Sequence, residues 1–401
     1  MRDCFDIVIV GAGVAGLTAA ALLAQDAQSR KYRLTVVDAG ERPAHDPGAD
    51  VALRVSAIAT GSAGVLNRAG AWEYVHDTRA CAYEGMRVWD ESQPVTGGAT
   101  LRFDASEFAV PQLGFIVENV LLQHALLGVL DDLDVALLFE SPLAGLREDR
   151  HRYRPQLADG RELRADLVIA ADGARSFVRE AAGIATREWR YGQSAFVTHL
   201  RPERPHRSIA WQRFLADGPL GMLPLDDGRI SVVWSTREER AGEAMQAADE
   251  ELASMLGEAS DWVLGELAPE GPRGTFPLCA RHAENYVLPG LVLIGDAAHA
   301  VHPLAGQGAN LGLRDAAALA SIVAAAVGSG EHPGDRPVLR RYERERKGDN
   351  ALMLHFMTGL NRLFATDSAF VRQLRTAGMR LFNYSGPVRE RMVGIALGQR
   401  P

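Results

Sequence analysis

The chain has 401 residues and a formal net charge of −8. This length predicts two domains, and the negative balance argues against general nucleic-acid binding. Three scattered cysteines are too few for a disulfide framework or a CxxC metal site, which favours a reducing, cytoplasmic compartment. No uncharged apolar run reaches 18 residues, so the sequence predicts no segment that crosses a bilayer.

The N-terminal segment carries a glycine pattern between a strand and a helix. An apolar run leads into Gly11, Gly13 and Gly16, and a helix rich in small residues follows. The first glycine allows a tight turn, the second lets a pyrophosphate approach the backbone, and the third lets helix and strand pack closely. A second strand over 32–37 ends at Asp38, where an acid is expected to bind the ribose of an adenine dinucleotide. The segment therefore predicts a dinucleotide-binding fold.

The middle of the chain carries the pattern of a second sheet. Residues 86–103 predict a hairpin, and residues 119–130 have helical periodicity. A short buried run then predicts a parallel strand that ends at Asp172. From 189 to 234 apolar and polar residues alternate between turn signals, which predicts an antiparallel sheet with one face available to a ligand.

A third connection from strand to helix follows this sheet. An apolar run from Leu291 leads directly into Gly295 and Asp296, and a turn rich in Pro and Gly precedes a helical pattern that begins near Ala309. Such a helix N-terminus leaves backbone N–H groups bare and carries a partial positive charge. It therefore suits a group that gains negative charge, such as the pyrimidine edge of a reduced flavin. Asp296, at the strand end, can accept hydrogen bonds from sugar-type hydroxyls.

The C-terminal segment differs in charge from the rest of the chain. Residues 336–401 hold 13 Lys and Arg against five acids, a net charge of +8, and apolar residues recur at helical spacing over 352–364. One interpretation is a helical appendage whose apolar face packs on the acidic body. The other is a peripheral membrane surface, or a surface for a partner protein.

These patterns predict an α/β fold with a Rossmann-like nucleotide-binding domain, an interleaved antiparallel-sheet substrate domain and a C-terminal helical segment. The predicted boundaries are 1–80, 104–185 and 275–335 for the discontinuous first domain, 81–103 and 186–274 for the second, and 336–401 for the helical segment.

Several stretches resemble the single-component flavoprotein aromatic hydroxylases, the group that includes p-hydroxybenzoate hydroxylase. The strand-end motifs at Gly11, Asp172 and Gly295 have the spacing of that group, and the resemblance covers nearly the whole chain. Within that group, five runs resemble the ubiquinone-biosynthesis hydroxylases in particular: 54–62, 117–123, 218–225, 231–235 and 302–308. The resemblance implies FAD as cofactor, NAD(P)H as reductant, and O₂ and a prenylated phenol or other aromatic compound as substrates.

The resemblance also implies roles for single residues. Arg54 would lie near the flavin and its pyrophosphate, and Gln123 would contact FAD where the family often has an arginine. Asp172 would belong to a motif that handles FAD and the nicotinamide cofactor, although spacing alone fits a simple strand-to-turn residue equally well. Gly295 and Asp296 would bind the ribityl or pyrophosphate region. The isoalloxazine ring would be framed by Pro303, Gly306, Gly308, Ala309 and Asn310.

The sequence assigns no catalytic side chain, because the phenol's own oxygen can drive the attack of the ring on activated oxygen. No His, Cys and Asp cluster has the spacing of a metal site. Two alternatives stay open: a flavin hydroxylase of a soluble aromatic acid or other secondary metabolite, and a non-catalytic FAD-bound subunit of a biosynthetic complex. The expected location is the cytoplasm, with peripheral attachment to the inner membrane face, and assembly into a homo-oligomer stays open.

Overall fold

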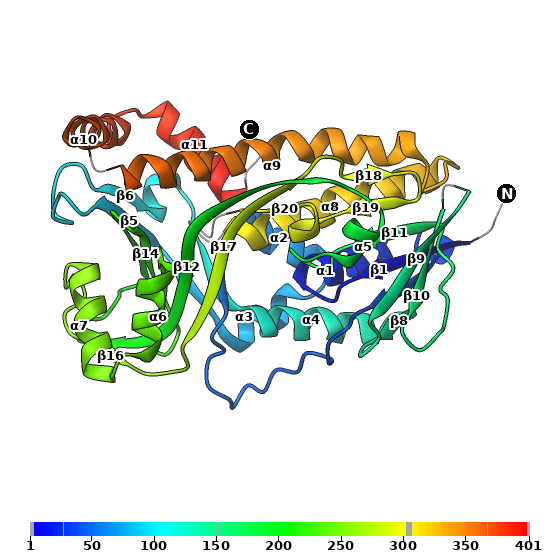
Figure 1. Cartoon of the computed structure of the whole chain (residues 1–401), viewed down its shortest axis with the longest axis horizontal. Helices are drawn as coiled ribbons and strands as arrows, with labels where there is room; N and C mark the ends of the chain where they lie inside the picture. Colours follow the sequence, from blue (N-terminus) through cyan, green and yellow to red (C-terminus); the bar gives the residue numbers. More distant parts are fainter. Residues whose placement is uncertain (1–3, 27, 151, 302–306, 367, 399–401) are drawn as a thin grey trace.

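The computed structural model describes residues 4–398, except 27, 151, 302–306 and 367. Two lobes lie side by side along the longest axis (Figure 1). They are joined by the long strands β12 (Thr186–Pro202) and β17 (Gly274–Ala283). The mixed α/β architecture predicted from the sequence is confirmed. The exact domain boundaries stay a prediction, because β12 and β17 run from one lobe into the other.

The first lobe is built on a six-stranded sheet of order β18-β19-β11-β1-β2-β8. Its central strand β1 (Phe5–Val10) pairs in parallel with β2 (Tyr32–Val37) and with β11 (Leu167–Ala170). The remaining strands are β8 (Val135–Leu138), β18 (Val287–Leu288) and β19 (Leu291–Leu293), and the main packing helices are α1 (Val14–Ala24), α4 (Asn119–Asp131) and α8 (Gln307–Gly328). β1 and β11 are almost continuously apolar because the sheet is buried inside the lobe.

Smaller elements complete this lobe. They are the sheet of β3 (Val55–Ala59), β7 (Gly114–Glu118) and β4 (Ala80–Tyr83), the helices α2 (Thr60–Arg68), α3 (Trp72–Arg79) and α5 (Phe177–Ala181), and the hairpin of β9 (Leu143–Asp149) and β10 (Arg152–Leu157). The strand β3 follows Arg54 directly, and the Arg54 guanidinium lies over the ring of Phe276 in β17, one of the strands that join the two lobes.

The second lobe is a mainly antiparallel sheet of order β20-β17-β12-β15-β14-β13-β5-β6. Its other members are β5 (Gly85–Asp90), β6 (Leu101–Asp104), β13 (Ile209–Leu215), β14 (Gly218–Pro224), β15 (Ile230–Arg237), β16 (Leu267–Pro269) and β20 (His299–Ala300). The hairpin and the antiparallel sheet predicted from the sequence are confirmed, since β5 pairs with β6 and β12 pairs with β15. Trp89, Phe196 and Trp234 fill a core that includes residues of α6 (Glu238–Gln246) and α7 (Asp249–Ser260).

Helix α8 is long and apolar. Its stretch Gly308–Gly328 has the length and hydropathy to cross a membrane, but most of it is buried inside the protein. Leu313, Ala316 and Leu319 are fully buried in the core of the first lobe. We therefore assign α8 as a core helix.

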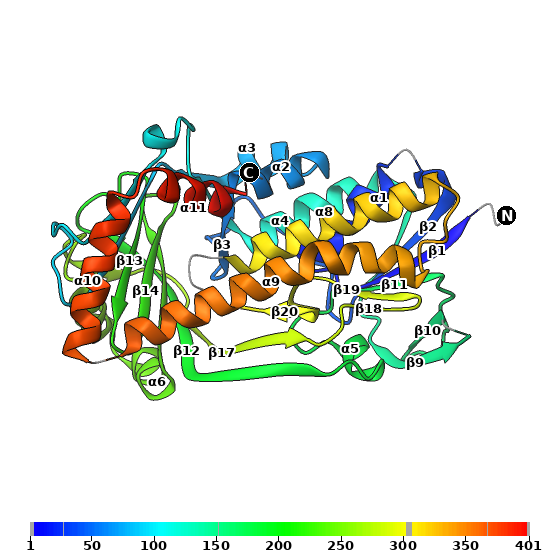
Figure 2. The same ribbon diagram turned by 90° about the horizontal axis from the view of Figure 1, so that it is seen from above.

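The C-terminal segment is helical, as predicted, and forms a layer over both lobes (Figure 2). It consists of α9 (Arg336–Ala365), α10 (Ala369–Asn383) and α11 (Pro387–Leu397). Helix α9 begins beside β18 and ends against β13 and β14 of the second lobe. There, Met357 and Phe364 pack with Phe214, whose ring stacks on Phe364 at 3.8 Å between centroids. One face of the segment therefore packs on the body of the protein.

Candidate functional site

The glycine loop after β1 has the geometry that its sequence predicts. Gly11 has a φ of +107°, and a Cβ at that position would lie 2.3 Å from the carbonyl oxygen of Ala171. A Cβ at Gly16 would lie 2.1 Å from the carbonyl oxygen of Gly11. A Cβ at Gly13 would meet no atom within 4 Å. The first and third glycines are therefore required by packing, whereas Gly13 faces open space in which a pyrophosphate can approach the backbone.

Asp38 and Gln123 both hold this loop through Ala12. The Ala12 N–H donates to Oδ2 of Asp38 over 2.6 Å, and the second carboxylate oxygen accepts the Gly40 N–H over 2.7 Å. Nε2 of Gln123, on α4, donates to the Ala12 carbonyl over 2.9 Å. Both residues thus lie beside the glycine loop, and their predicted contacts with FAD stay predictions. The structure adds that each fixes the loop's conformation.

Asp172 follows β11 and bonds to its own turn. Its Oδ1 accepts the hydroxyl of Ser176 over 2.5 Å, and its Oδ2 accepts the Val178 N–H over 3.1 Å at the start of α5. Burial raises the pKa of this carboxyl. The geometry favours the strand-to-turn interpretation, and a direct contact with FAD or the nicotinamide cofactor stays a prediction.

Arg179 is a residue that sequence reasoning missed. It lies in the short helix α5, is 2% exposed, and donates to the Ala297 carbonyl over 3.1 Å and to the Ala174 carbonyl over 3.1 Å. It therefore links the turn after β11 to the turn after β19. An arginine inside a short helix carries no sequence signal for this role, because the two carbonyls come together only in the folded chain.

Asp296 and Arg54 approach each other from distant parts of the chain. Asp296 lies just after β19, in the turn where Gly295 has a φ of +56°. Desolvation by the surrounding protein atoms raises the pKa of its carboxyl group, while the neighbouring His299 and Arg54 act in the opposite direction. The Arg54 guanidinium lies over the ring of Phe276, 5.4 Å from its centroid. No hydrogen bond to Asp296 occurs within the part of the chain that the structure describes.

Asn310 connects the first turn of α8 to β3. It is 1% exposed, its Nδ2 donates to the Ala57 carbonyl over 2.8 Å, and its Oδ1 accepts the Ala59 N–H over 2.9 Å. Asn310 thus fixes the strand that follows Arg54 against the helix predicted to face the flavin. Gly308 and Ala309 are half-buried in the same turn. Pro303 and Gly306 lie outside the described residues.

Behind this turn lies a buried charge cluster to which the sequence assigned no role. Asp315 is fully buried and accepts four hydrogen bonds, from Gly295 N (3.1 Å), His299 Nε2 (2.5 Å), Arg346 Nε (2.8 Å) and Asn350 Nδ2 (3.1 Å). Burial by itself raises the pKa of Asp315, but His299 and Arg346 outweigh it and lower the pKa to about 2. The carboxylate therefore stays charged and fixes the Gly295–Asp296 turn against α8 and α9.

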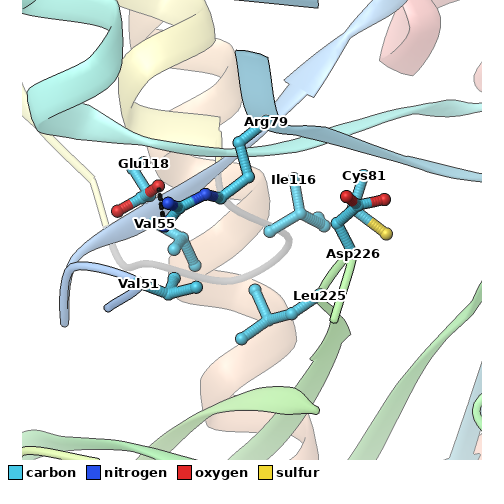
Figure 3. A pocket seen from close by; sticks show the side chains of 8 residues that line it. All are labelled: Val51, Val55, Arg79, Cys81, Ile116, Glu118, Leu225 and Asp226. Carbon is cyan, nitrogen blue, oxygen red and sulfur yellow. Dashed lines mark hydrogen bonds and ion pairs between the residues drawn. The ribbon is translucent and has the colours of Figure 1, made fainter. Parts of the chain in front are cut away.

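Figure 3 shows a small pocket between the β3–β7–β4 sheet and the turn after β14. It is lined by Val51, Val55, Arg79, Cys81, Ile116, Glu118, Leu225 and Asp226. Arg79 donates to Glu118 over 3.1 Å, and burial raises the pKa of the Cys81 thiol to about 12. The thiol is therefore protonated at neutral pH and is a poor nucleophile. The pocket contains none of the predicted flavin-binding residues, and we assign it no chemistry.

The arrangement of the site fits a large anionic dinucleotide. Gly13 is open for a pyrophosphate, Arg54 supplies a cation, and Asp296 offers a carboxylate without a protein partner among the described residues. The carboxyl ends of β1, β11 and β19 lie side by side, which is where open parallel sheets bind ligands. Among the described residues, no group of three His, Cys, Asp or Glu side chains could hold a metal ion.

Comparison with known proteins agrees with this geometry. Residues 4–356 match the family model described as FAD binding domain. The chain is 35% identical to 3-demethoxyubiquinol 3-hydroxylase of Escherichia coli, with 98% of each chain covered. It is 38% identical to ubiquinone hydroxylase UbiL of Rhodospirillum rubrum over 98% of this chain and 89% of that protein. The chain belongs to the FAD-dependent hydroxylase family of ubiquinone biosynthesis.

A solved structure supports the fold of this FAD-dependent hydroxylase. PqsL of Pseudomonas aeruginosa, in complex with 2-aminobenzoylacetate, superposes with a TM-score of 0.76 at 23% identity and covers 94% of this chain and 99% of that one. The family and the relatives confirm the predicted monooxygenase class and the FAD cofactor. They do not favour the alternative of a non-catalytic subunit. The contacts that single residues make with FAD stay predictions.

Proposed function

We propose that this hydroxylase oxidises the aromatic ring of a polyprenylated phenol in ubiquinone biosynthesis, using NAD(P)H and O₂. The observation that carries the proposal is that the glycine loop and the Gly295–Asp296 turn lie at neighbouring strand ends, with Arg54 near enough to lower the pKa of Asp296. The relatives named as ubiquinone hydroxylases match this chain over nearly its full length.

The proposed cofactor contacts follow the geometry of the site. Gly13 admits the pyrophosphate, Asp38 binds the adenosine ribose, Arg54 binds a phosphate, and Asp296 binds the ribityl chain. The first turn of α8 would face the isoalloxazine through Gly308, Ala309 and Asn310. Pro303 and Gly306 lie outside the described residues, and their contact with the ring stays what the resemblance implies. FAD, when bound, supplies hydride acceptance and oxygen activation. The protein orients FAD and the ring, keeps water out, and offers backbone N–H groups of α8 to developing negative charge.

The lipid-soluble substrate has a consequence for location. A polyprenyl tail resides in a bilayer, so we propose that the enzyme works at the inner face of a membrane without crossing it. The basic segment 336–401 is the part of the chain predicted to meet that membrane or another biosynthetic protein.

One experiment tests the proposed substrate class. The purified holoenzyme is supplied with NADH or NADPH and with either a short-chain prenylated phenol or a prenyl-free hydroxybenzoate, and the products are identified by mass spectrometry. We expect the addition of one oxygen atom to the prenylated ring, with NAD(P)H consumed in equal amount. Coupled hydroxylation of the prenyl-free acid alone would assign the enzyme to soluble aromatic acids. Bound FAD without any substrate-stimulated NAD(P)H oxidation would refute a catalytic role.

Replacement of Arg54 tests the cofactor contact. We expect Arg54→Gln to weaken FAD binding by roughly 10–100-fold, because a charge-assisted contact contributes about 1.5–3 kcal/mol. The pKa of Asp296 should also rise further, since Arg54 opposes that rise. FAD affinity of the variant should therefore fall more steeply than that of the wild type as the pH is lowered. Fluorescence titration of the apoprotein measures both effects.

The matched control for this substitution is Arg68→Gln, at an exposed position on α2. It should leave the FAD affinity unchanged. Equal affinities of Arg54→Gln and the wild type would remove Arg54 from the cofactor site.

A further inference from the structure

The exposed apolar side chains of this protein are concentrated in one place. Among the residues that the structure describes, fourteen large apolar side chains are exposed, and ten of them lie on or directly beside the three C-terminal helices. We call these ten the C-terminal apolar surface: Leu352, Phe356 and Leu363 on α9, Phe370, Leu374 and Leu381 on α10, Tyr384 directly after α10, and Val388, Met392 and Ile395 on α11. Single exposed apolar residues are ordinary, whereas a cluster of this size marks an interaction site.

The members of this surface recur at helical spacing. On α10, Phe370, Leu374 and Leu381 are 68%, 55% and 74% exposed and share one face of the helix. The opposite face packs on the second lobe through Met379 and Arg375, which are both buried. Each of the three helices thus has one apolar face on the protein and a second one turned outward, and together they form the outer layer seen in Figure 2.

Arginines border the surface at regular positions. Arg362, Arg380 and Arg391 each directly precede one of its residues, namely Leu363, Leu381 and Met392. All three arginines are exposed, and none of them forms an ion pair with any described residue. Residues 351–398 contain six arginines and two acids. The surface therefore combines outward apolar side chains with unpaired positive charge.

A buried ion pair holds this layer in place. Arg375 of α10 pairs with Asp90 of β5 at 2.6 Å, and both side chains are almost completely buried. At the other end, the Thr60 hydroxyl donates to the Leu397 carbonyl over 3.2 Å, beside the β3 strand that Asn310 fixes. The layer is thus fixed to the body at both ends, and α11 ends beside Thr60, next to the β3 strand that Asn310 contacts.

The charge of the surface decides between two kinds of occupant. Two copies of the chain that met through these faces would bring two rims of the same sign together, which opposes association. An anionic lipid bilayer offers the opposite charge at its headgroups and an apolar interior below them. A surface of apolar stripes bordered by arginines is complementary to such a bilayer.

We propose that α10, α11 and the C-terminal half of α9 dock on an anionic bilayer, with the C-terminal apolar surface inserted to the headgroup boundary and Arg362, Arg380 and Arg391 at the lipid phosphates. The functional role of docking rests on the proposed function: a polyprenylated ring would pass from the bilayer into the enzyme near the end of α11. The docking itself does not depend on the identity of the substrate.

Vesicle flotation of the full-length holoenzyme tests the docking. One vesicle population contains phosphatidylcholine alone, and the other contains phosphatidylcholine with about one third phosphatidylglycerol. We expect the wild type to float with the anionic vesicles and to detach as salt is raised. The double variant Leu374→Ser, Leu381→Ser should lose roughly 10-fold in affinity through lost apolar insertion. The triple variant Arg362→Gln, Arg380→Gln, Arg391→Gln should lose roughly 100-fold and much of the salt dependence.

The control is Met245→Ser, which changes another exposed apolar residue, 40% exposed, on α6, away from the C-terminal layer. It should float like the wild type. Equal flotation of the double variant and the wild type would overturn the proposal. The proposal would also be overturned if the wild type did not float with anionic vesicles and instead formed dimers, detected by light scattering, that the double variant does not form. Hydroxylation of a short-chain prenylated phenol without vesicles should be unchanged in the double variant, so this assay separates a failure of docking from a failure of the proposed function.

Discussion

Replacement of Asp315 by asparagine is expected to lower the free energy of unfolding by about 3–5 kcal/mol, because it leaves the buried positive charge of Arg346 without its buried carboxylate partner. In the wild type the Asp315 carboxylate accepts hydrogen bonds from Gly295, His299, Arg346 and Asn350. An uncharged amide cannot balance the guanidinium, and its NH₂ group would face other donors. Because only one acceptor oxygen remains for two pairs of donors, the Gly295–Asp296 turn should be held less firmly, and FAD affinity should fall as well. Denaturant unfolding of the apoprotein and FAD titration measure the two effects.

The pH dependence of stability follows from the same residue. The pKa of Asp315 in the folded protein is lowered from 3.8 to about 2. A lowered carboxyl pKa contributes stability that is fully present above the unfolded value, near pH 4, and is lost as the pH falls toward 2. The wild type should therefore lose stability over this window, and Asp315→Asn should lose correspondingly less. If the free energy of unfolding fell by the same amount in both proteins between pH 4 and 2, protonation of Asp315 would not be the cause of the loss.

Asp349 provides a matched control for this experiment. It contacts the same arginine, with its Oδ2 3.4 Å from Nη1 of Arg346, but its side chain is 72% exposed. An exposed ion pair contributes about 0–1 kcal/mol, so Asp349→Asn should change stability only slightly and leave FAD binding intact. Similar losses for both variants would mean that Asp315 is not the centre of the cluster.

Valine in place of Gly13 is expected to abolish FAD binding while leaving the apoprotein folded. A Cβ at Gly13 meets no protein atom within 4 Å, so the side chain costs little in the folded chain, but it fills the space that the pyrophosphate needs. Gly16→Val should behave differently, because its Cβ would lie 2.1 Å from the Gly11 carbonyl oxygen and would force apart α1 and β1. We expect at least 100-fold weaker FAD binding for Gly13→Val with an unchanged unfolding midpoint, and a lower midpoint for Gly16→Val.

Thermal unfolding of the apoproteins and FAD titration distinguish these two outcomes. Gly64→Ala, in α2, serves as a control, since a Cβ there also meets no atom within 4 Å and lies outside the proposed site. Normal FAD binding by Gly13→Val would refute the assignment of the glycine loop to the pyrophosphate.

Much of the site could be predicted because its signals are local. Gly11, Gly13 and Gly16 are spaced by the geometry of one turn, and Asp38 ends the next strand of the same unit. The resemblance assigned Gln123 and Asp172 to the cofactor site. The structure adds their hydrogen-bond partners, which spacing along the chain could not predict. Gln123 donates to the loop carbonyl of Ala12, and Asp172 bonds to the start of α5.

The sequence by itself determined the strands, the glycine turns and the chemical class of the ligand, because each depends on backbone conformations set by a few neighbouring residues. Only the tertiary structure brought Arg54 to Asp296 and assembled the donors around Asp315, since those partners lie far apart along the chain. It also decided which apolar residues face outward. Phe356 and Met357 are neighbours of similar hydrophobicity, yet Phe356 is 43% exposed and Met357 is 7% exposed. Helical periodicity separates the two faces, but only the docking of α9 on β13 selects the one that is buried.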